Sequence, residues 1–309
     1  MTTEEAQHYN LTNPPEDGIT NVVFHPTKQN LLLSSSWDKT IRIHDTVSCQ
    51  MNTKIDHDTP MLDACFGSGV NIFSAGLDGQ VNWIDIVKEE KQKLGSHSKG
   101  ARSLCWSNNT NMLYSGSWDK SICTWDPRSK HHLTGEYKLS QKVYSMDMKE
   151  NTLVVAFPHH RLLVYDIRKM DKPRKVRDTA LKYMLKTVRL SPDGKAFACS
   201  SIEGRVTMDF FDHDNGDKRY AFKLHRQRHG TFASGGSDGT VSIWDGVNQK
   251  RIRQFPKYTE EISDVAFNCD GTQLAIARSY TFDEGERPHA PDAIFIRTLG
   301  VNDCKPRPD

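Results

Sequence analysis

Histidine, serine and aspartate recur along the chain in the same order and at nearly the same spacing. Together these residue types could form the triad of a hydrolase, in which a histidine takes the proton of a serine nucleophile. The sets are His57, Ser74 and Asp78, followed by His97, Ser115 and Asp119 with Trp125. A catalytic site is needed once, whereas these sets recur with the period of a repeating unit. We therefore expect a structural hydrogen-bond network that keeps buried polar groups paired, and no catalytic residue.

The residues around these sets belong to a repeated phrase. The stretch SGSWDKSICTWD has counterparts in SSSWDKTIRIHD, SAGLDGQVNWID and SGGSDGTVSIWD, and the four copies end at Asp126, Asp45, Asp85 and Asp245. In each copy a small-residue segment leads into a tight turn, after which apolar and polar residues alternate as in a β-strand. The turn residues, which lie 40, 41 and 40 residues apart, are Asp38, Asp78, Asp119 and His159. This period is typical of WD-repeat propeller blades with four short strands each.

We therefore predict an all-β fold, a seven-bladed WD-repeat β-propeller formed by a single domain that spans residues 1–309. Residues 1–17 are expected to supply a latch strand near Tyr9 and a loop, and residues 300–309 to form a frayed tail. The turn at Glu203 lies only 35 residues before the next turn, at Asp238. The segment YAFKLH is expected to be the outer strand of blade five. Blade six is then expected to lack its inner strand.

The charge balance is nearly even, so binding to nucleic acid or to an acidic membrane would have to come from a local patch. The 41 basic and 39 acidic side chains give a formal charge of +2, which provides no bulk attraction to nucleic acid or to an acidic membrane surface. No apolar run is long enough to cross a membrane, and the acidic N-terminus MTTEEAQHYN does not resemble a signal peptide. We expect a soluble intracellular protein without membrane contact.

Neither metal nor cofactor binding is expected. The seven cysteines are scattered without a CxxC pair, so we expect free thiols, most of them buried, and no disulfide or zinc site. His159 and His160 are adjacent on a strand and would point to opposite faces, which does not suit a shared metal ion. The glycines lie at turns and do not form a phosphate-binding loop.

Four residues have no explanation in the repeat. Trp37 and Trp118 precede the turn acid, where a typical repeat carries a small or polar residue. Arg205 follows the turn of blade five, and Arg226 follows its outer strand. All four are expected near one face of the propeller. Tryptophan and arginine commonly anchor interfaces, and a guanidinium group matches carboxylate or phosphate. The alternative is that the tryptophans are simply packed and the arginines simply solvated.

Several segments together resemble a known family. NPPEDGITNVVFHP, SSSWDK, SGSWDKSICTWDPR, SSIEGRV, YAFKLHR and IFIRTL are similar to the spindle-checkpoint WD-repeat family called budding-uninhibited-by-benzimidazole three. The similarity spans nearly the whole chain. SSIEGRV with YAFKLHR also resembles the messenger-RNA export factor of the nuclear pore, whereas NPPEDGI and the short tail favour the checkpoint family.

The resemblance implies a non-catalytic scaffold that recruits checkpoint proteins in mitosis, found in the nucleus, at kinetochores and in the cytoplasm. It implies that Trp37, Trp118 and Arg205 contact the GLEBS motif, a short acidic helix-forming segment of checkpoint kinases and related scaffolds. Arg226 falls on a position that contacts phosphate in phosphorylated MELT motifs of a kinetochore scaffold. No cofactor is implied.

Two other functions remain as alternatives. An export factor would bind a nucleoporin GLEBS motif and RNA, and the near-zero net charge speaks against RNA binding. A propeller enzyme would need convergent polar groups in a central channel, which these strands do not offer. The chain also departs from the family, because His229 and Gly230 follow Arg226 almost at once where the family has a further inner strand. This indicates either a shortened transcript or gene model, or an isoform with a gap in blade six.

Overall fold

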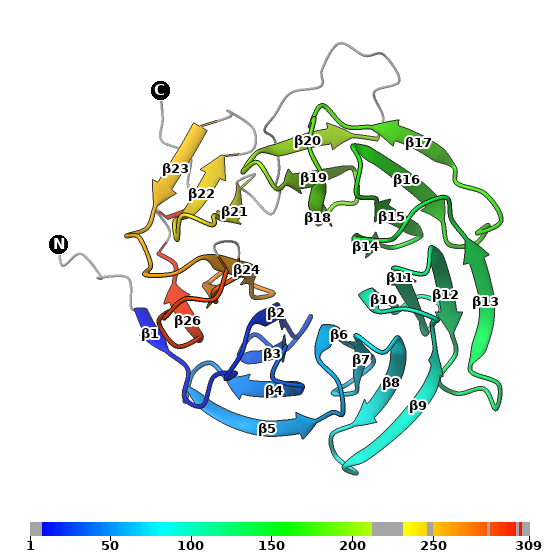
Figure 1. Ribbon diagram of the computed structural model, residues 1–309, viewed down its shortest axis with the longest axis horizontal. Coiled ribbons are helices and arrows are strands. Elements are labelled where there is room, and N and C mark those ends of the chain that lie inside the picture. Colours follow the sequence, from blue (N-terminus) through cyan, green and yellow to red (C-terminus); the bar gives the residue numbers. More distant parts are fainter. Residues whose placement is uncertain (1–7, 212–230, 246–249, 283–284, 301–302, 305–309) are drawn as a thin grey trace. The chain divides into compact units, whose positions relative to one another are not determined.

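The computed structural model of the chain consists of β-strands and their connections (Figure 1). It describes residues 8–211, 231–245, 250–282, 285–300 and 303–304, and no helix occurs among these residues. In this part of the chain the strands form seven sheets, most of them from strands that follow one another in the sequence. The predicted all-β architecture with seven blades is confirmed.

The chain divides into two compact units, which are described separately. Unit 1 comprises Met1–Ala64, Thr231–Asp245 and Lys250–Asp309, and unit 2 comprises Cys65–Gly230 and Gly246–Gln249.

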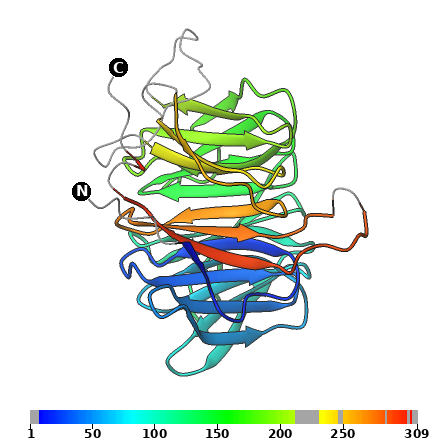
Figure 2. The same cartoon turned by 90° about the vertical axis from the view of Figure 1, so that its left-hand side faces the viewer.

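Unit 1 contains three sheets. The first consists of β2 (Ile19–Phe24), β3 (Leu31–Ser36), β4 (Thr40–Asp45) and β5 (Gln50–Asp56). The second consists of β21 (Thr231–Gly235), β22 (Val241–Asp245) and β23 (Lys250–Gln254). The third has the order β1 (His8–Asn10), β26 (Ala293–Thr298), β25 (Gln273–Arg278) and β24 (Ile262–Phe267). In this sheet, the described parts of the connection between β25 and β26 extend beyond the ends of the strands (Figure 2).

Three further sheets lie in unit 2. The first consists of β10 (Ala101–Ser107), β11 (Met112–Ser117), β12 (Ser121–Trp125) and β13 (Leu133–Lys138). The second consists of β14 (Ser145–Lys149), β15 (Thr152–Ala156), β16 (Arg161–Asp166) and β17 (Lys175–Asp178). The third consists of β18 (Leu185–Leu190), β19 (Ala196–Ser201) and β20 (Val206–Phe210). The seventh sheet begins in unit 1 and continues in unit 2, with β6 (Met61–Phe66), β7 (Ile72–Gly76), β8 (Gln80–Asp85) and β9 (Glu90–Ser96).

Burial differs along each sheet in the way its sequence predicts. The outer strand β5 (QMNTKID) alternates between exposed and half-buried residues, whereas the interior strands β7, before its turn, and β12, after its turn, are buried throughout. A strand that is covered on both faces is apolar or small at every position, and a strand that faces solvent alternates. The SSS, SAG and SGS segments therefore mark the middle strands, where small side chains fit between packed neighbours.

The turn between the middle strand and the next strand has one repeated geometry. Asp119 Oδ1 accepts a hydrogen bond from the Ser121 N–H at 3.0 Å, and Lys120 between them has a φ of 67°. Lys39 occupies the same position with the same φ, and Gly79 occupies it with a φ of 82°. A Cβ on Gly79 would lie 2.5 Å from the carbonyl oxygen of His97, so this copy of the turn requires glycine. These turns place the acidic residues of the repeat at the strand ends.

The N-terminal strand pairs with a strand from the other end of the sequence. β1 runs antiparallel to β26, with Tyr9 opposite Ile296, and the Leu11 N–H donates to the carbonyl of Ile294 at 3.0 Å. Leu11 is 3% exposed and packs with Ile294 and Ile296. The segment expected near Tyr9 is thus the fourth strand of the β24–β26 sheet.

Two sheets have three strands among the residues that the structure describes, β18–β20 and β21–β23. Ser234 precedes Asp238 by four residues, as Ser115 precedes Asp119, so β21 occupies the middle-strand position and not the inner one. The expected outer strand of blade five, at residues 220–225, lies outside the described residues, as does Arg226.

The expectation that most cysteines are buried is wrong. All seven are free thiols, but only Cys105, Cys123 and Cys199 are buried, and Cys269 is exposed in the turn after β24. The buried cysteines lie within apolar strands, where burial raises the pKa of the Cys123 thiol to about 12 and suppresses its reactivity. The others lie at turns or at positions that neighbouring strands cover incompletely.

Candidate functional site

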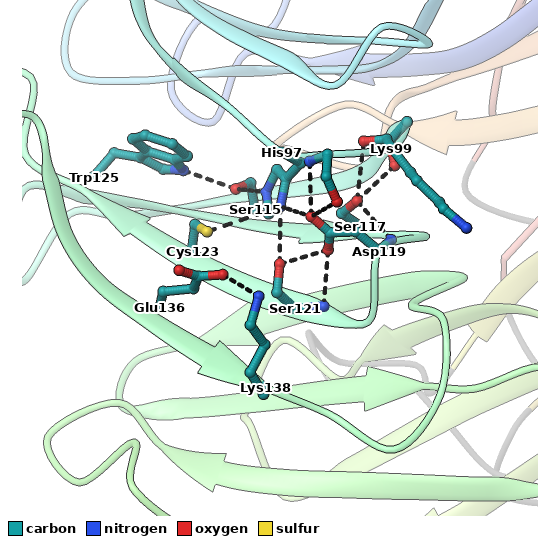
Figure 3. A network of polar contacts seen from close by, with 12 residues as sticks. His97, Lys99, Ser115, Ser117, Asp119, Ser121, Cys123, Trp125, Glu136 and Lys138 are labelled. Atoms are coloured by element: carbon teal, nitrogen blue, oxygen red, sulfur yellow. Dashed lines mark hydrogen bonds and ion pairs between the residues drawn. The ribbon is translucent and has the colours of Figure 1, made fainter.

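The β10–β13 sheet contains a buried network of four side chains (Figure 3). His97 lies in the connection between β9 and β10, and its Nδ1 is 3.2 Å from Asp119 Oδ2. Its Nε2 is 2.7 Å from Ser115 Oγ. Trp125 Nε1 donates to the same Ser115 oxygen at 2.7 Å. The structure therefore brings together all four residues of the best sequence repeat, from two strands, a turn and a connection.

The bonding pattern fixes the protonation of the imidazole. The Asp119 carboxylate can only accept a hydrogen bond, so the neutral imidazole of His97 carries its proton on Nδ1 and donates it to Asp119. Nε2 of His97 then accepts the hydroxyl proton of Ser115, whose oxygen accepts the indole N–H of Trp125. Ser115 is fully buried, and its oxygen already accepts the indole N–H. A serine held in this way has no access to a substrate, so the arrangement provides stability and no route to nucleophilic chemistry.

Burial and hydrogen bonding shift the pKa values within this network. Desolvation lowers the pKa of His97, although the neighbouring Asp119 carboxylate acts in the opposite direction. For Asp119, desolvation alone would raise the pKa, but hydrogen bonds from Ser121, Ser98 and Ser117, together with His97, hold it below its ordinary value. The folded protein thus favours a neutral imidazole beside a carboxylate.

These shifts predict that acidification weakens the fold. In the unfolded chain His97 binds a proton when the pH drops below about 6.5, whereas in the folded chain protonation of His97 needs a lower pH. The free energy of unfolding therefore decreases as the pH is lowered below about 6.5. Because the pKa of Asp119 is lowered in the folded protein, the free energy of unfolding decreases further once the pH is below the pKa of an ordinary aspartate. Urea unfolding of the wild type at pH 7.5, 6.5 and 5.5 measures the first effect.

The matched variant is His97→Gln, which keeps hydrogen-bonding capacity and does not titrate. Its free energy of unfolding should be lower at pH 7.5 but should decline less steeply between pH 7.5 and 5.5. The pKa of His44 is also lowered by burial, and this histidine is present in both proteins, so the difference in slope isolates His97. Equal slopes would show that His97 does not contribute to the pH dependence.

In the corresponding network of unit 1, an arginine takes the place of the histidine. In the β2–β5 sheet the carboxylate of the turn acid Asp38 accepts a hydrogen bond from Arg42 Nη2 at 2.8 Å, and Arg42 Nε donates to Thr40 Oγ1 at 3.1 Å. Arg42 is 4% exposed. When the repeat at residues 34–45 is aligned with the repeat at residues 115–126, Arg42 corresponds to Cys123 and His44 corresponds to Trp125. An arginine from within the sheet therefore replaces the histidine that elsewhere comes from the preceding connection.

The second set predicted from sequence is less complete. Ser74 accepts a hydrogen bond from Asn82 Nδ2 at 3.5 Å, and both carboxylate oxygens of exposed Asp78 accept from Gln80. His57 belongs to unit 1, whereas Ser74 and Asp78 belong to unit 2. Asp78 thus stabilises its own turn, and among the described residues of unit 2 it is not hydrogen-bonded to the network position of Ser74.

One short motif resembles a catalytic signature without its structural context. Gly235 to Gly239 has the spacing GxSxG, which marks the nucleophile turn of some hydrolases. In this protein the segment connects the antiparallel strands β21 and β22, and no helix follows among the described residues. The strand-to-helix turn that exposes such a serine is therefore not formed here.

Three of the four predicted contact residues lie at strand ends, and each has exposed surface. Trp37 in unit 1 is 42% exposed, and the half-buried Trp118 in unit 2 precedes its turn acid in the same way. The Arg205 side chain is 74% exposed, with its Nε 3.6 Å from Glu203. Arg226 lies outside the described residues.

The structure adds two apolar residues that sequence analysis missed. Leu77 and Ile202 occupy the same position before the turn residue as Trp118, and they are 36% and 57% exposed. Tyr183 is also exposed, and its neighbour Met184 accepts the Ile202 N–H at 3.0 Å. Comparing the residue before the turn in every repeat could have found them, because three of the copies in unit 2 carry a large apolar side chain there.

No helix long and apolar enough to cross a membrane occurs in the described part of the chain. Within the same residues, no group of three or more histidine, cysteine, aspartate or glutamate side chains is placed to hold a metal ion.

Known proteins resemble this chain over nearly its full length. The WD domain, G-beta repeat family matches residues 7–45, 88–126 and 221–245. Mitotic checkpoint protein BUB3.1 of Arabidopsis thaliana is 39% identical over 322 residues, which cover 96% of this chain and 94% of the relative. The chain belongs to the family of the BUB3 mitotic checkpoint proteins. Mitotic checkpoint protein bub3 of Dictyostelium discoideum, another family member, is 37% identical and covers 95% of each chain.

Two further similarities bear on function and fold. The mRNA export factor GLE2 of Chaetomium thermophilum is 30% identical and covers 96% of this chain and 92% of its own. The solved structure of U3-55K superposes with a TM-score of 0.81 at 14% identity, covering 94% of this chain and 98% of that one, which concerns the fold alone. The alignment with the Arabidopsis member of the family is longer than the 309 residues of this chain, so that relative has residues that this chain lacks.

Proposed function

We propose that the protein is a non-catalytic scaffold of the spindle assembly checkpoint that binds GLEBS motifs of checkpoint kinases and phosphorylated MELT motifs at kinetochores. The observation that carries the proposal is the exposed tryptophan before the turn acid, Trp37 in unit 1, with its counterpart Trp118 in unit 2. Aromatic side chains at such positions anchor partner segments, since they bury a large area with little loss of conformational freedom. Membership of the BUB3 family supports the checkpoint assignment.

The proposed binding divides between two chemistries. Trp37, Trp118 and Arg205 are assigned to the GLEBS motif, where the exposed Arg205 guanidinium suits the acidic side chains of such a helix. Arg226 is assigned to the phosphorylated MELT motif. A phosphothreonine carries a charge of about −1.5 to −2 and three acceptor oxygens, which an arginine can pair and an unmodified threonine cannot offer. Phosphorylation of the MELT motif by a kinase would thus create the binding site for this protein, and checkpoint proteins would be recruited in mitosis.

Two single variants separate the two sites. We expect Trp118→Ala to weaken binding of a GLEBS peptide by about 2 kcal/mol or more, roughly 30-fold, because an aromatic anchor is lost. The same variant should leave binding of a phosphorylated MELT peptide within about twofold. Arg226→Ala should do the reverse. Isothermal titration of the purified full-length chain with each peptide gives the four affinities.

The control is Leu133→Ala, which removes an exposed apolar residue from the outer strand β13 and should change neither affinity. Equal loss of both peptides in either test variant would contradict the assignment of separate sites. A GLEBS affinity that is unchanged in both Trp37→Ala and Trp118→Ala would contradict the scaffold proposal itself.

The similarity to GLE2 supports a second candidate, an mRNA-export factor that binds a nucleoporin GLEBS motif and RNA. Both candidates share the GLEBS motif, so the identity of the partner decides between them. A checkpoint kinase that co-purifies from mitotic cells supports the first function, and a nucleoporin supports the second. The formal charge of +2 favours the first, because RNA binding depends on a basic surface. We place the protein in the nucleus and cytoplasm, and at kinetochores in mitosis.

A further inference from the structure

The indole of Trp37 lies against the backbone of a glycine in the connection before β2. A Cβ on Gly18 would lie 3.1 Å from Cδ1 of Trp37 and 3.8 Å from its Cγ. Carbon atoms in favourable contact are about 3.5–4.0 Å apart, so the ring in this position leaves no room for a side chain at residue 18. Trp37 nevertheless keeps 42% of its surface exposed. Gly18 thus supports one edge of the indole and leaves much of the ring accessible.

The backbone conformation of Gly18 does not itself require glycine. Gly79 has a φ of 82°, a region that other residues rarely adopt, whereas the φ of Gly18 lies outside that region. Beyond Trp37, the nearest atom to a Cβ at residue 18 would be Ser279 Oγ at 4.0 Å, which is an ordinary contact. The close approach of the indole is therefore the local feature that a side chain at residue 18 would disturb.

Hydrogen bonds on both sides of Gly18 hold its backbone in place. Its N–H donates to Asp17 Oδ1 at 2.7 Å, and its carbonyl accepts the N–H of Trp37 at 2.9 Å. The N–H of the next residue, Ile19, donates to Ser279 Oγ at 2.9 Å. Because the backbone is held in this way, a side chain at residue 18 would displace the partly exposed indole and leave the peptide groups where they are.

A glycine also accompanies the equivalent tryptophan of unit 2. The N–H of Trp118 donates to the carbonyl of Gly100 at 3.0 Å, as the N–H of Trp37 donates to Gly18. The hydroxyl of Ser117 donates to the same Gly100 carbonyl at 2.9 Å. The φ of Gly100 is not positive either. Both tryptophans that precede a turn acid are thus bonded to a glycine whose backbone does not require one.

Two other repeats show that this backbone hydrogen bond does not depend on glycine. In the β18–β20 sheet the residue equivalent to Trp37 is Ile202, whose N–H donates to the carbonyl of Met184 at 3.0 Å. In the β24–β26 sheet it is Ser279, whose N–H donates to the carbonyl of Glu261 at 2.9 Å. In these four repeats glycine stands where the partner residue is tryptophan. The missing side chain is therefore connected with the indole and not with the backbone bond.

We propose that Gly18 is a positioning residue for Trp37, because its missing side chain lets the indole rest on the backbone in the orientation that a partner segment binds. This inference rests on the proposed function, in which Trp37 contacts the GLEBS motif. A ring that is held in place before binding loses less conformational freedom on binding than a ring that moves freely. Ordering one large side chain on binding corresponds to about twofold to tenfold in affinity. Gly18 thus raises the affinity through Trp37.

The test combines Gly18→Val with Trp37→Ala in the full-length chain. Gly18→Val alone should weaken binding of a synthetic GLEBS peptide by at least about fivefold in isothermal titration, because the valine side chain displaces the indole. In a chain that already carries Trp37→Ala, adding Gly18→Val should change the affinity by less than about twofold, since no indole is left to displace. Binding of the phosphorylated MELT peptide should stay within about twofold of the wild type throughout.

Two further measurements separate positioning from a structural role. The urea midpoint of Gly18→Ala should equal or exceed that of the wild type, because alanine suits this backbone and restricts the unfolded chain, while its GLEBS affinity should fall by about twofold or more. In a chain labelled with fluorinated tryptophan, the fluorine resonance of Trp37 is identified by its loss in Trp37→Ala. This resonance should shift in Gly18→Val, whereas that of buried Trp125 in the β10–β13 sheet should not.

The possible failures give different results. The inference is overturned, and the proposed function stands, if Trp37→Ala weakens GLEBS binding while Gly18→Val and Gly18→Ala do not. It is also overturned if Gly18→Val costs the same affinity with and without Trp37, or if the Trp37 resonance does not move. Trp37→Ala that binds the peptide like the wild type would instead contradict the contact assigned to Trp37 itself. If Gly18→Val does not fold, Gly18→Ala provides the same comparisons.

Discussion

Trp125→Ala is expected to lower the free energy of unfolding by about 3–5 kcal/mol. Trp125 is 2% exposed, and its ring fills the space beside Gly95, where an added Cβ would lie 2.3 Å from the indole. The variant loses this packing and also the hydrogen bond that the indole N–H donates to Ser115. Urea unfolding at pH 7.5, followed by fluorescence of the remaining tryptophans, measures the change.

The matched control lies in the same sheet, seven residues earlier in the sequence. Trp118 is half-buried at a strand end, so Trp118→Ala should cost about 1 kcal/mol or less. The two tryptophans would then separate stability from partner binding. A similar loss of stability in both variants would show that Trp118 is a core residue and would remove the main support for its role as a contact.

Asp119→Ala is expected to cost about 3 kcal/mol. The carboxylate accepts hydrogen bonds from both the N–H and the hydroxyl of Ser121, at 3.0 and 2.5 Å, and from the Ser98 N–H at 3.0 Å. It also lies 3.2 Å from Nδ1 of His97, a side chain with no exposed surface. Without the carboxylate the buried donors of Ser121 and His97 lose their partner, which costs more than the bonds themselves contribute.

Asp78→Ala provides the comparison for this variant. Asp78 occupies the same turn position in its own repeat, but it is exposed, and among the described residues it accepts hydrogen bonds from Gln80. We expect a cost of about 1 kcal/mol or less, because water replaces these bonds. Thermal unfolding of both variants beside the wild type tests the difference. Equal destabilisation would mean that the turn itself, and not the buried network, accounts for the role of the aspartate.

Much of the fold follows from the sequence because its determinants are local. The turn acid, the small residues before it and the alternating strand after it lie within about a dozen positions, and they recur with a constant period. The His97 network was predictable for the same reason, since its four residue types stand at fixed distances from the turn. Because the period is constant, the shorter spacing between the turns at Glu203 and Asp238 was recognisable in the sequence. The structure has a three-stranded sheet, β21–β23, at Asp238 among its described residues.

Features that depend on substitution within the repeat were not predicted. In the first repeat no histidine precedes the turn at the usual spacing, and nothing in the pattern indicated that Arg42 would supply the missing donor from within the sheet. The exposure of Ile202 and of Cys269 was missed as well. Exposure depends on how neighbouring strands cover a residue, and residue type alone does not determine it.

The pairing of β1 with β26 has a consequence for synthesis on the ribosome. The segment of β1 emerges first, and its partner strand emerges on the order of tens of seconds later at ordinary rates of translation. The first complete sheet can hold the segment meanwhile, because the Thr12 N–H donates to the Cys49 carbonyl at 3.0 Å and Arg42 donates to the Asn13 carbonyl at 2.9 Å. With these contacts the β1 segment can stay near the first sheet until β26 has been synthesised. β26 can then pair with β1 at a smaller cost in loop-closure entropy than with a freely moving N-terminal segment.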